Sequence, residues 1–208
     1  MNLIASVLHL DRQAIKALRI TDPYSLHRVV YSLYDDVRSP DAKRGSEPSG
    51  ILYADQGGDF LHRKIALLAD RAPAACVHGR YGHVYSKPIP EEFLDHARYR
   101  FKVMINPTRR DSSTGKLVPV KGRVEIAQWF SERATKWGFQ LSQDHLQVDA
   151  IDVLQFRDKA QRQITMARAH IQGILEVTDR QSFCNSFQRG IGRGRAFGCG
   201  LLQIVPLR

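Results

Sequence analysis

Cysteine is scarce in this chain, and the cysteines present are too far apart for the common cysteine-based structures. There are only three, at positions 76, 184 and 199, and no two of them form a Cys-x-x-Cys pair. We therefore expect neither a disulfide framework nor a zinc site. A reducing cytoplasm is the compartment that fits this composition best.

Long apolar runs and common cofactor motifs are also missing. No window approaches the roughly 18 apolar residues of a membrane-spanning helix. The N-terminal apolar run, Leu3–Leu8, has no basic segment before it, which predicts a first strand and not a signal peptide. No P-loop, Rossmann fingerprint or Gly-x-Ser-x-Gly elbow occurs. We expect no membrane partner, no metal and no cofactor.

Acidic residues are outnumbered by basic ones. The chain has 21 Asp and Glu residues and 31 Lys and Arg residues, which gives a net charge of +10 and a pI of about 9.8. A protein this basic typically has a polyanionic partner, of which nucleic acid is the commonest. Contact with a ribosome and contact with an anionic membrane are the other candidates. The 43% hydrophobic content is ordinary for a globular protein, and 208 residues suit one large or two small domains.

The first half of the chain shows the order strand, helix, strand, strand, weak helix, strand. The main helix begins at Asp22, which is a suitable N-cap, and Pro23, which suits the first helical position. It is predicted to run to about Asp36. The strands and the weak helix are predicted at Asn2–Leu10, Ile51–Asp55, Lys64–Leu68, Arg71–Tyr81 (the helix) and His83–Pro88.

The second half repeats that order more clearly. Its elements are a strand at Ala97–Ile105, a helix at Arg123–Trp137, a hairpin at Ile151–Phe156 and Ile164–Val177, a helix from Asp179 to Gly190, and a strand at Cys199–Leu207. We predict an α+β fold of two tandem ferredoxin-like (RRM-like) βαββαβ domains, residues 1–90 and 97–208. The boundary is expected near Pro90–His96.

His27 is the first candidate for chemistry. At 100° per residue, Leu26, Val29, Val30 and Leu33 share one apolar sector of the helix, whereas Tyr24, His27, Arg28, Tyr31 and Tyr34 share another. An imidazole serves as general acid or base near neutral pH, which metal-free RNA cleavage requires. A tyrosine one turn earlier is placed to orient it. By spacing alone, a partly exposed histidine without a role remains the preferred interpretation.

The second candidate is a glycine-rich segment, Gly190–Gly200, which holds five glycines in eleven residues. Such a backbone is able to form a nest of N–H groups for an anion, here at Gly192 and Gly194, and Arg193 and Arg195 add charge for phosphates. The alternative is a flexible connection between a helix and a strand.

Basic side chains form the third candidate. In the strand Ala97–Ile105, alternation places Arg98, Arg100, Lys102 and Met104 on an outer face. Further clusters are Arg157, Lys159 and Arg162 at the hairpin tip, and Lys116, Lys121 and Arg123 in the middle loop. Each cluster alone is more often just a solvated surface, but their sum is better supported, because the net positive charge must lie somewhere on the protein. Since the RNP signature of stacking aromatics is absent, shape and phosphate recognition of structured RNA is favoured over base stacking.

Three segments together resemble one family. Gly190–Leu202 is similar to the glycine-rich signature of CRISPR repeat-processing endoribonucleases, in particular the CasE (Cse-three) branch of type I-E Cascade. The Tyr-x-x-His of Tyr24 and His27 resembles that branch's segment at the start of its first helix. A weaker likeness is the strand through Phe101 followed by Asn106-Pro107.

The resemblance implies tandem ferredoxin-like domains and recognition of the CRISPR repeat RNA hairpin. It implies metal-independent cleavage at the 3′ base of that hairpin, leaving a 2′,3′-cyclic phosphate, with the product retained as crRNA in a Cascade-like effector complex. By position, His27 would be catalytic and Tyr24 its partner. Separately from the resemblance, Arg28 is a candidate RNA-binding residue because it lies next to His27. Two alternatives stay open: a non-catalytic hairpin-RNA-binding subunit of such a complex, and a basic ribosome- or DNA-associated protein.

Overall fold

A computed structural model describes residues 2–39, 41, 48–59 and 61–207. The chain divides into two compact units, Met1–Ile89 and Pro90–Arg208, hereafter unit 1 and unit 2. This division falls at the start of the segment in which the sequence places the domain boundary.

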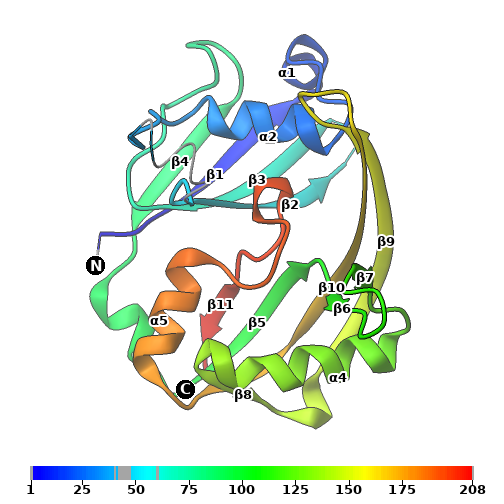
Figure 1. Cartoon of the computed structure of the whole chain (residues 1–208). Coiled ribbons are helices and arrows are strands. Elements are labelled where there is room, and N and C mark those ends of the chain that lie inside the picture. The colour runs from blue at the N-terminus through cyan, green and yellow to red at the C-terminus, as the bar shows by residue number, and fades with distance from the viewer. Residues whose placement is uncertain (1, 40, 42–47, 60, 208) are drawn as a thin grey trace. The chain divides into compact units, whose positions relative to one another are not determined.

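Unit 1 is a four-stranded antiparallel sheet with helices (Figure 1). The strands lie in the order β2-β3-β1-β4, so β3 separates β1 from β2 as in the split βαβ arrangement of a ferredoxin-like domain. The bounds are β1 (Ile4–Asp11), α1 (Arg12–Ala17), α2 (Pro23–Tyr31), β2 (Ile51–Gly58), β3 (His62–Ala69) and β4 (His83–Pro88).

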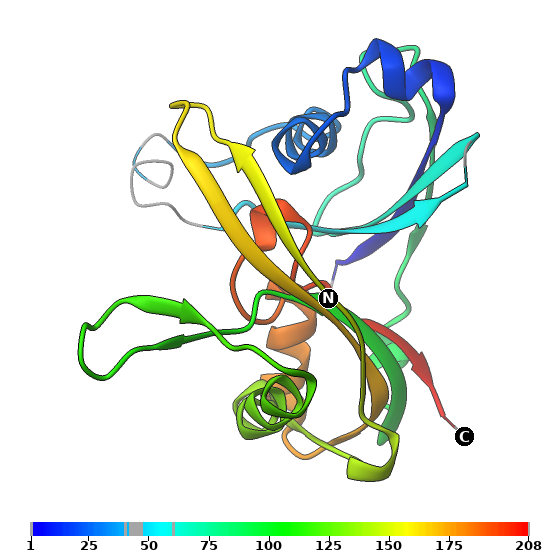
Figure 2. The ribbon, with the colours of Figure 1, turned by 90° about the vertical axis from the view of Figure 1, so that its right-hand side faces the viewer.

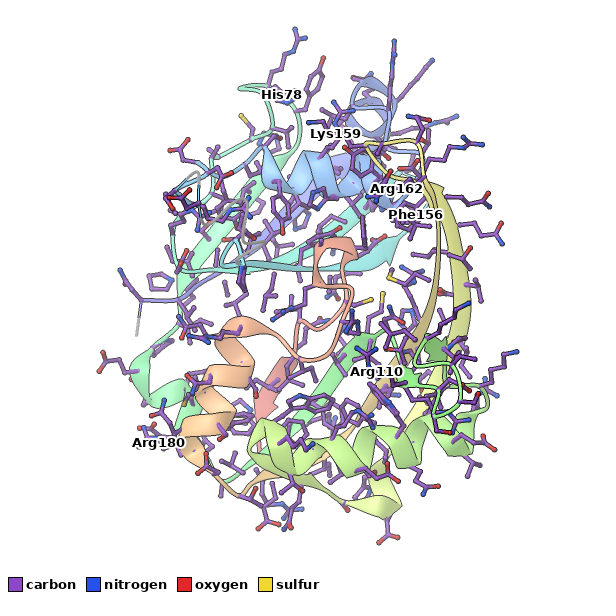
Figure 3. The ribbon with its side chains drawn as sticks, viewed as in Figure 1. His78, Arg110, Phe156, Lys159, Arg162 and Arg180 are labelled. Atoms are coloured by element: carbon purple, nitrogen blue, oxygen red, sulfur yellow. The ribbon has the colours of Figure 1, made fainter. Side chains whose placement is uncertain are left out.

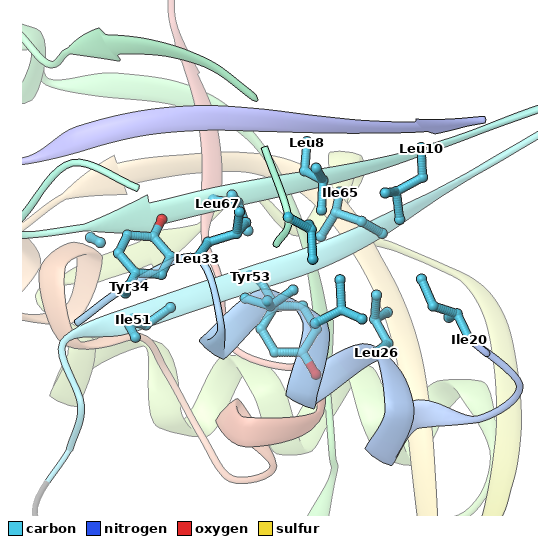
Figure 4. Close-up of a cluster of buried hydrophobic side chains, with 14 of the residues drawn as sticks. Leu8, Leu10, Ile20, Leu26, Leu33, Tyr34, Ile51, Tyr53, Ile65 and Leu67 are labelled. Carbon is cyan, nitrogen blue, oxygen red and sulfur yellow. The ribbon is translucent and has the colours of Figure 1, made fainter. Parts of the chain in front are cut away.

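The core of unit 1 forms between α2 and the sheet (Figure 4). The predicted apolar sector of α2 is confirmed, because Leu26, Val29, Val30 and Leu33 are all buried. They share one hydrophobic cluster with strand residues that include Tyr53 and Ile65, which are almost fully buried. Burying one face of α2 fixes the direction of its opposite, polar face.

Helix α2 ends earlier than predicted, at Tyr31 and not near Asp36. The Ser32 hydroxyl donates to the carbonyl of Val29 (2.9 Å), and the N–H of Tyr34 bonds three residues back to Tyr31. Such local serine bonds compete with helical ones. The 100° projection therefore fails for Tyr34, which is buried in the core and not on the polar face.

Two further segments of unit 1 differ from the prediction. No helix forms at Arg71–Tyr81; instead, the N–H of Ala74 bonds to the carbonyl of Leu33, and Val77 pairs with Tyr81 in an isolated bridge. A bond to a residue outside the segment and a bridge across a turn within it thus take the place of a regular helix. The short helix α1 was not predicted, although Asp11 caps it by accepting from the N–H of Ala14.

Unit 2 repeats the same sheet order, and Figure 2 shows its long hairpin extending from the sheet. The order β11-β5-β10-β8 is the second ferredoxin-like arrangement, with β9 paired along β10. The tandem ferredoxin-like fold is thus confirmed. The bounds are β5 (Arg98–Ile105), β6 (Thr108–Arg110), β7 (Leu117–Pro119), α4 (Arg123–Ala134), β8 (Phe139–Leu141), β9 (Gln147–Arg157), β10 (Gln163–Val177), α5 (Arg180–Arg189) and β11 (Gln203–Pro206).

The helices of unit 2 pack on one face of the sheet. Ring contacts join Phe101 of β5 to Phe130 of α4, and Tyr99 of β5 to Phe183 of α5. The small hairpin β6–β7 and the strand β8 were not predicted. Among the residues described, no helix combines the length and apolarity needed to cross a bilayer.

Candidate functional site

The polar face of α2 starts at a fixed helix terminus. The Asp22 carboxylate accepts from the N–H of Ser25 (2.7 Å), and the Ser25 hydroxyl accepts from the N–H of Asp22 (3.0 Å), which completes a capping box. Pro23 occupies the first turn as predicted. Because Tyr24 and His27 lie in or next to this first turn, the capping box sets their backbone positions.

Three rings lie together along this face. The Tyr24 and His27 rings are 6.1 Å apart between centroids and 20° from parallel, and the Tyr31 ring lies 4.0 Å from His27 on the other side. Each of the three is only partly buried, and Arg28 next to them is exposed. The structure therefore brings together Tyr24, His27 and Tyr31, and places an exposed guanidinium beside them.

Tyr31 is connected to the end of the sheet. Its hydroxyl is bonded to the hydroxyl of Ser49 (3.0 Å), and the Ser49 carbonyl accepts from Arg71 (3.1 Å). Arg71 also donates to the carbonyl of Asp35 (3.2 Å), just beyond α2. The same guanidinium lies 5.6 Å from the centre of the Tyr34 ring, whose burial raises the pKa of its phenol. The sequence did not predict Ser49 and Arg71 near the site, because both are distant from α2 in sequence and only the fold brings them close to Tyr31.

Replacing Asp22 by alanine should lower the free energy of unfolding by about 1 kcal/mol, because it removes the N-cap acceptor. Urea denaturation would measure the loss. Asp35→Ala removes the same charge at an exposed position past the other end of α2, and should change stability by less than about 0.5 kcal/mol. Equal losses in the two variants would contradict a specific capping role.

The basic hairpin tip is ordered by one carboxylate. Asp158 accepts from the N–H groups of Ala160 and Arg162, and from the Arg162 guanidinium at 2.8 Å. The hydrogen bond from that guanidinium lowers the pKa of Asp158. Arg157 donates to the carbonyl of Gln161, whereas Lys159 is exposed at the tip (Figure 3). The tip thus presents three cations, one of them paired with Asp158.

The outer face of β5 is basic as predicted for most of its length. Arg98, Arg100 and Lys102 are exposed, and they alternate with buried residues that face the helices. Met104 differs from the prediction, because it is buried against Met166 and Cys199. The glycine-rich segment covers this end of the strand, which is why alternation alone gave the wrong exposure.

The glycine-rich segment is packed into unit 2. Gly200 donates to the carbonyl of Met104 (2.7 Å), and the Phe197 ring packs at a tilt of 60° against Phe156 of the long hairpin, with 4.7 Å between ring centroids. Arg195 donates to the carbonyl of Arg189 (2.8 Å), at the C-terminal end of α5. Cys199 of this segment is buried, and burial raises the pKa of its thiol to about 12. This segment therefore supports the hairpin close to its tip.

Gly192 and Arg193 are less closely packed than Gly194 and Gly200, and nothing lies within 4 Å of the position where a Cβ of Gly192 would stand. Arg193 is exposed and pairs through its backbone with Asn106, while Gly194 is closely surrounded by Met166, Asn106 and Cys199 side chains. Of the predicted phosphate-binding residues here, Arg193 is accessible, whereas Arg195 already serves to cap α5. Among the described residues, no group of three or more His, Cys, Asp or Glu side chains is arranged to hold a metal ion.

Known proteins resemble this chain over nearly its full length. Residues 3–206 match the family model described as CRISPR associated protein. The CRISPR-associated endoribonuclease Cse3 of Thermus thermophilus is 30% identical over 136 residues, which cover 61% of this chain and 64% of that protein. The chain thus matches somewhat under two thirds of the length of this relative.

Two solved structures share the fold. CRISPR endoribonuclease Cse3 bound to a 19 nt RNA superposes with a TM-score of 0.81 at 23% identity, covering 98% of this chain and 99% of that one. Cas6e of Escherichia coli K-12 superposes with a TM-score of 0.63 at 18% identity, covering 99% and 100% of the two chains. Together with the family match, this leads to one conclusion: the chain belongs to the CRISPR associated protein family.

Proposed function

We propose that this protein is an endoribonuclease that cleaves CRISPR precursor RNA at the 3′ base of the repeat hairpin. One observation carries the proposal: His27 lies partly exposed between two phenol rings on the polar face of α2, in a member of a CRISPR associated family. The 30% identity to a protein named as a CRISPR endoribonuclease supports it. The activity requires no metal, because an imidazole supplies the proton transfer.

The proposed reaction is an internal phosphoryl transfer within the RNA. The ribose 2′-OH loses its proton and its oxygen attacks the adjacent phosphorus. The bond from phosphorus to the 5′-oxygen breaks, and that oxygen takes up a proton. The products are a 2′,3′-cyclic phosphate and a 5′-hydroxyl. His27 takes the first proton or gives the second, and Tyr24 positions the imidazole or the scissile phosphate.

The RNA is recognised through basic surfaces of unit 2 together with the site in unit 1. The hairpin tip with Arg157, Lys159 and Arg162 is suited to the phosphates of a folded stem, and Arg98, Arg100 and Lys102 extend a basic strip along β5. The partners are the repeat RNA hairpin, kept as crRNA, and further subunits of a Cascade-like effector complex, in line with likenesses to chains of CRISPR RNA-guided surveillance complexes.

The test is a cleavage assay of the wild-type protein with an end-labelled repeat hairpin from the neighbouring CRISPR array, in EDTA. We expect a single cut below the hairpin, at the same rate as without EDTA, and a cyclic phosphate on the upstream product. Tight hairpin binding without a cut would indicate a non-catalytic subunit instead. Equal binding of unstructured or duplex competitors would point to a general nucleic-acid-binding protein. Loss of cleavage on chelation would contradict the metal-free reaction.

A further inference from the structure

A basic pocket of about 570 Å³ lies on unit 2, and of the candidate RNA-binding residues only Gly192 and Arg193 line it. Its walls come from three places: the hairpin β6–β7, the last turns of α4 with the 3₁₀ turn that follows, and the glycine-rich segment. The residues that line it are Thr108, Arg109, Arg110, Leu117, Trp129, Glu132, Arg133, Lys136, Trp137, Gly192 and Arg193.

The charge of this pocket is strongly one-sided. Five of the lining residues are Arg or Lys, and Glu132 is the one carboxylate among them. Glu132 is 4.0 Å from Arg133, which also lies over the Trp129 ring at 4.4 Å. Five positively charged side chains thus share one pocket with a single carboxylate. Their mutual repulsion is unfavourable, and an anion bound between them would relieve it.

Three of the five cations are available to a ligand. Arg109, Lys136 and Arg193 are exposed, and none of them forms an ion pair with another residue that the structure describes. Arg133 is held by its own helix, through a bond to the carbonyl of Trp129. Arg110, which Figure 3 labels, donates to the carbonyl of Gly115. The available cations come from β6, the turn after α4 and the glycine-rich segment, so they span the pocket from wall to wall.

The presence of available cations on all three walls favours a polynucleotide strand over a single phosphate group. A nucleic acid strand carries one charge per nucleotide, so a strand crossing the pocket meets successive cations. The tryptophans offer little for base stacking: Trp129 is buried with its N–H bonded to the carbonyl of Thr108, and Trp137 packs against Phe130 and Phe139. The pocket is therefore built for contact with the backbone and not with the bases.

The pocket is separate from the other basic surfaces of the same unit. It includes α4, which packs on the face of the sheet opposite Arg98, Arg100 and Lys102. Figure 2 shows the hairpin β6–β7 and the tip of the hairpin β9–β10 projecting in different directions. A stem held at the tip of β9–β10 would leave this pocket to a different part of the transcript.

We propose that this pocket binds the sugar-phosphate backbone of the single-stranded RNA that flanks the repeat hairpin. This inference rests on the proposed function for the identity of the RNA, but not for the binding itself. Here the protein holds the flank by charge, without regard to its sequence.

The test compares Arg109→Gln/Lys136→Gln with wild type in the full chain, using two RNAs: the repeat hairpin alone and the hairpin with single-stranded flanks. We expect the double variant to bind the flanked RNA at least tenfold more weakly and the bare hairpin within about twofold of wild type. The slope of log Kd against log salt for the flanked RNA should fall by about 1.4, since each contact to a single strand contributes about 0.7. Lys16→Gln/Lys87→Gln removes the same charge from exposed positions of unit 1, and should leave both affinities unchanged.

Three results would overturn the proposal. The first is an unchanged Kd and salt slope for the flanked RNA. The second is an equal loss for the bare hairpin, which would assign the pocket to the stem. The third is unchanged RNA binding with lost association to other subunits, which would make the pocket a protein interface. A wild type that binds but fails to cleave would refute the proposed function alone, because the comparison of affinities still decides the role of the pocket.

Discussion

Replacing His27 by alanine is expected to lower the rate of hairpin cleavage by about 10²–10⁴-fold, which is the range that general acid–base catalysis contributes. The affinity for the RNA should change by less than about threefold. The reason is the geometry of α2: His27 lies on the polar face between Tyr24 and Tyr31, while the core residues of the helix lie on the other side. Removal of the imidazole therefore takes away the proton transfer without disturbing the packing.

Single-turnover cleavage at saturating enzyme measures this effect, because it separates chemistry from binding and product release. His83→Ala serves as the matched control, since it removes an exposed imidazole from β4 of the same unit, and it should cleave like wild type. Circular dichroism would establish that His27→Ala is folded. Cleavage by that folded variant at the wild-type rate would remove His27 from the mechanism.

Replacing Gly200 by alanine is expected to lower the free energy of unfolding of unit 2 by roughly 3 kcal/mol or more. Gly200 has φ +84°, which costs an L-residue about 1–2 kcal/mol. A Cβ there would lie 2.3 Å from the Ile191 carbonyl oxygen, so the backbone would have to move. Movement would strain the bonds from Ile191 N–H to Gly200 and from Gly200 N–H to Met104. The expected loss is large because the cost of the positive φ and the weakening of two backbone hydrogen bonds add together.

Gly192→Ala is the matched control for this experiment. Gly192 has a similar φ of +70°, but nothing lies within 4 Å of the position where a Cβ would stand. It should therefore lose only about 1–2 kcal/mol, the conformational part alone. Tryptophan fluorescence during urea denaturation reports on unit 2 specifically, because both tryptophans, Trp129 and Trp137, belong to it. Equal losses for the two variants would show that the close approach to Ile191 is not what fixes this glycine.

Local rules worked where neighbouring residues decide the structure. Asp22 and Pro23 begin α2 as predicted, because capping depends on groups within one helical turn. Asp179 caps α5 in the same way, by accepting from the N–H of Ser182. The alternation along β5 places Arg98, Arg100 and Lys102 outward because a strand has a fixed period of two.

The predictions failed where distant parts of the chain meet. Helical periodicity places Val124 on the apolar stripe of α4 together with Phe130 and Ala134. In the structure Val124 is 76% exposed, whereas Trp129 is buried. Trp129 is able to be buried because its N–H finds the carbonyl of Thr108, twenty-one residues earlier in sequence. No pattern within the helix indicates that the Thr108 carbonyl is the partner of Trp129. The same holds for the basic pocket, whose cations come from separate segments.

The sequence by itself determined the two ferredoxin-like units and placed Tyr24 and His27 on one face of a helix, because hydrophobic periodicity and capping act within short segments. Its glycine-rich signature and Tyr-x-x-His motif also indicated the family. Only the tertiary structure decided that Tyr31, whose ring contacts His27, is connected to Ser49 and Arg71, and that the glycine-rich segment supports the long hairpin. The physical reason is that these contacts join residues far apart in sequence, and burial and hydrogen-bond partners there are fixed by packing.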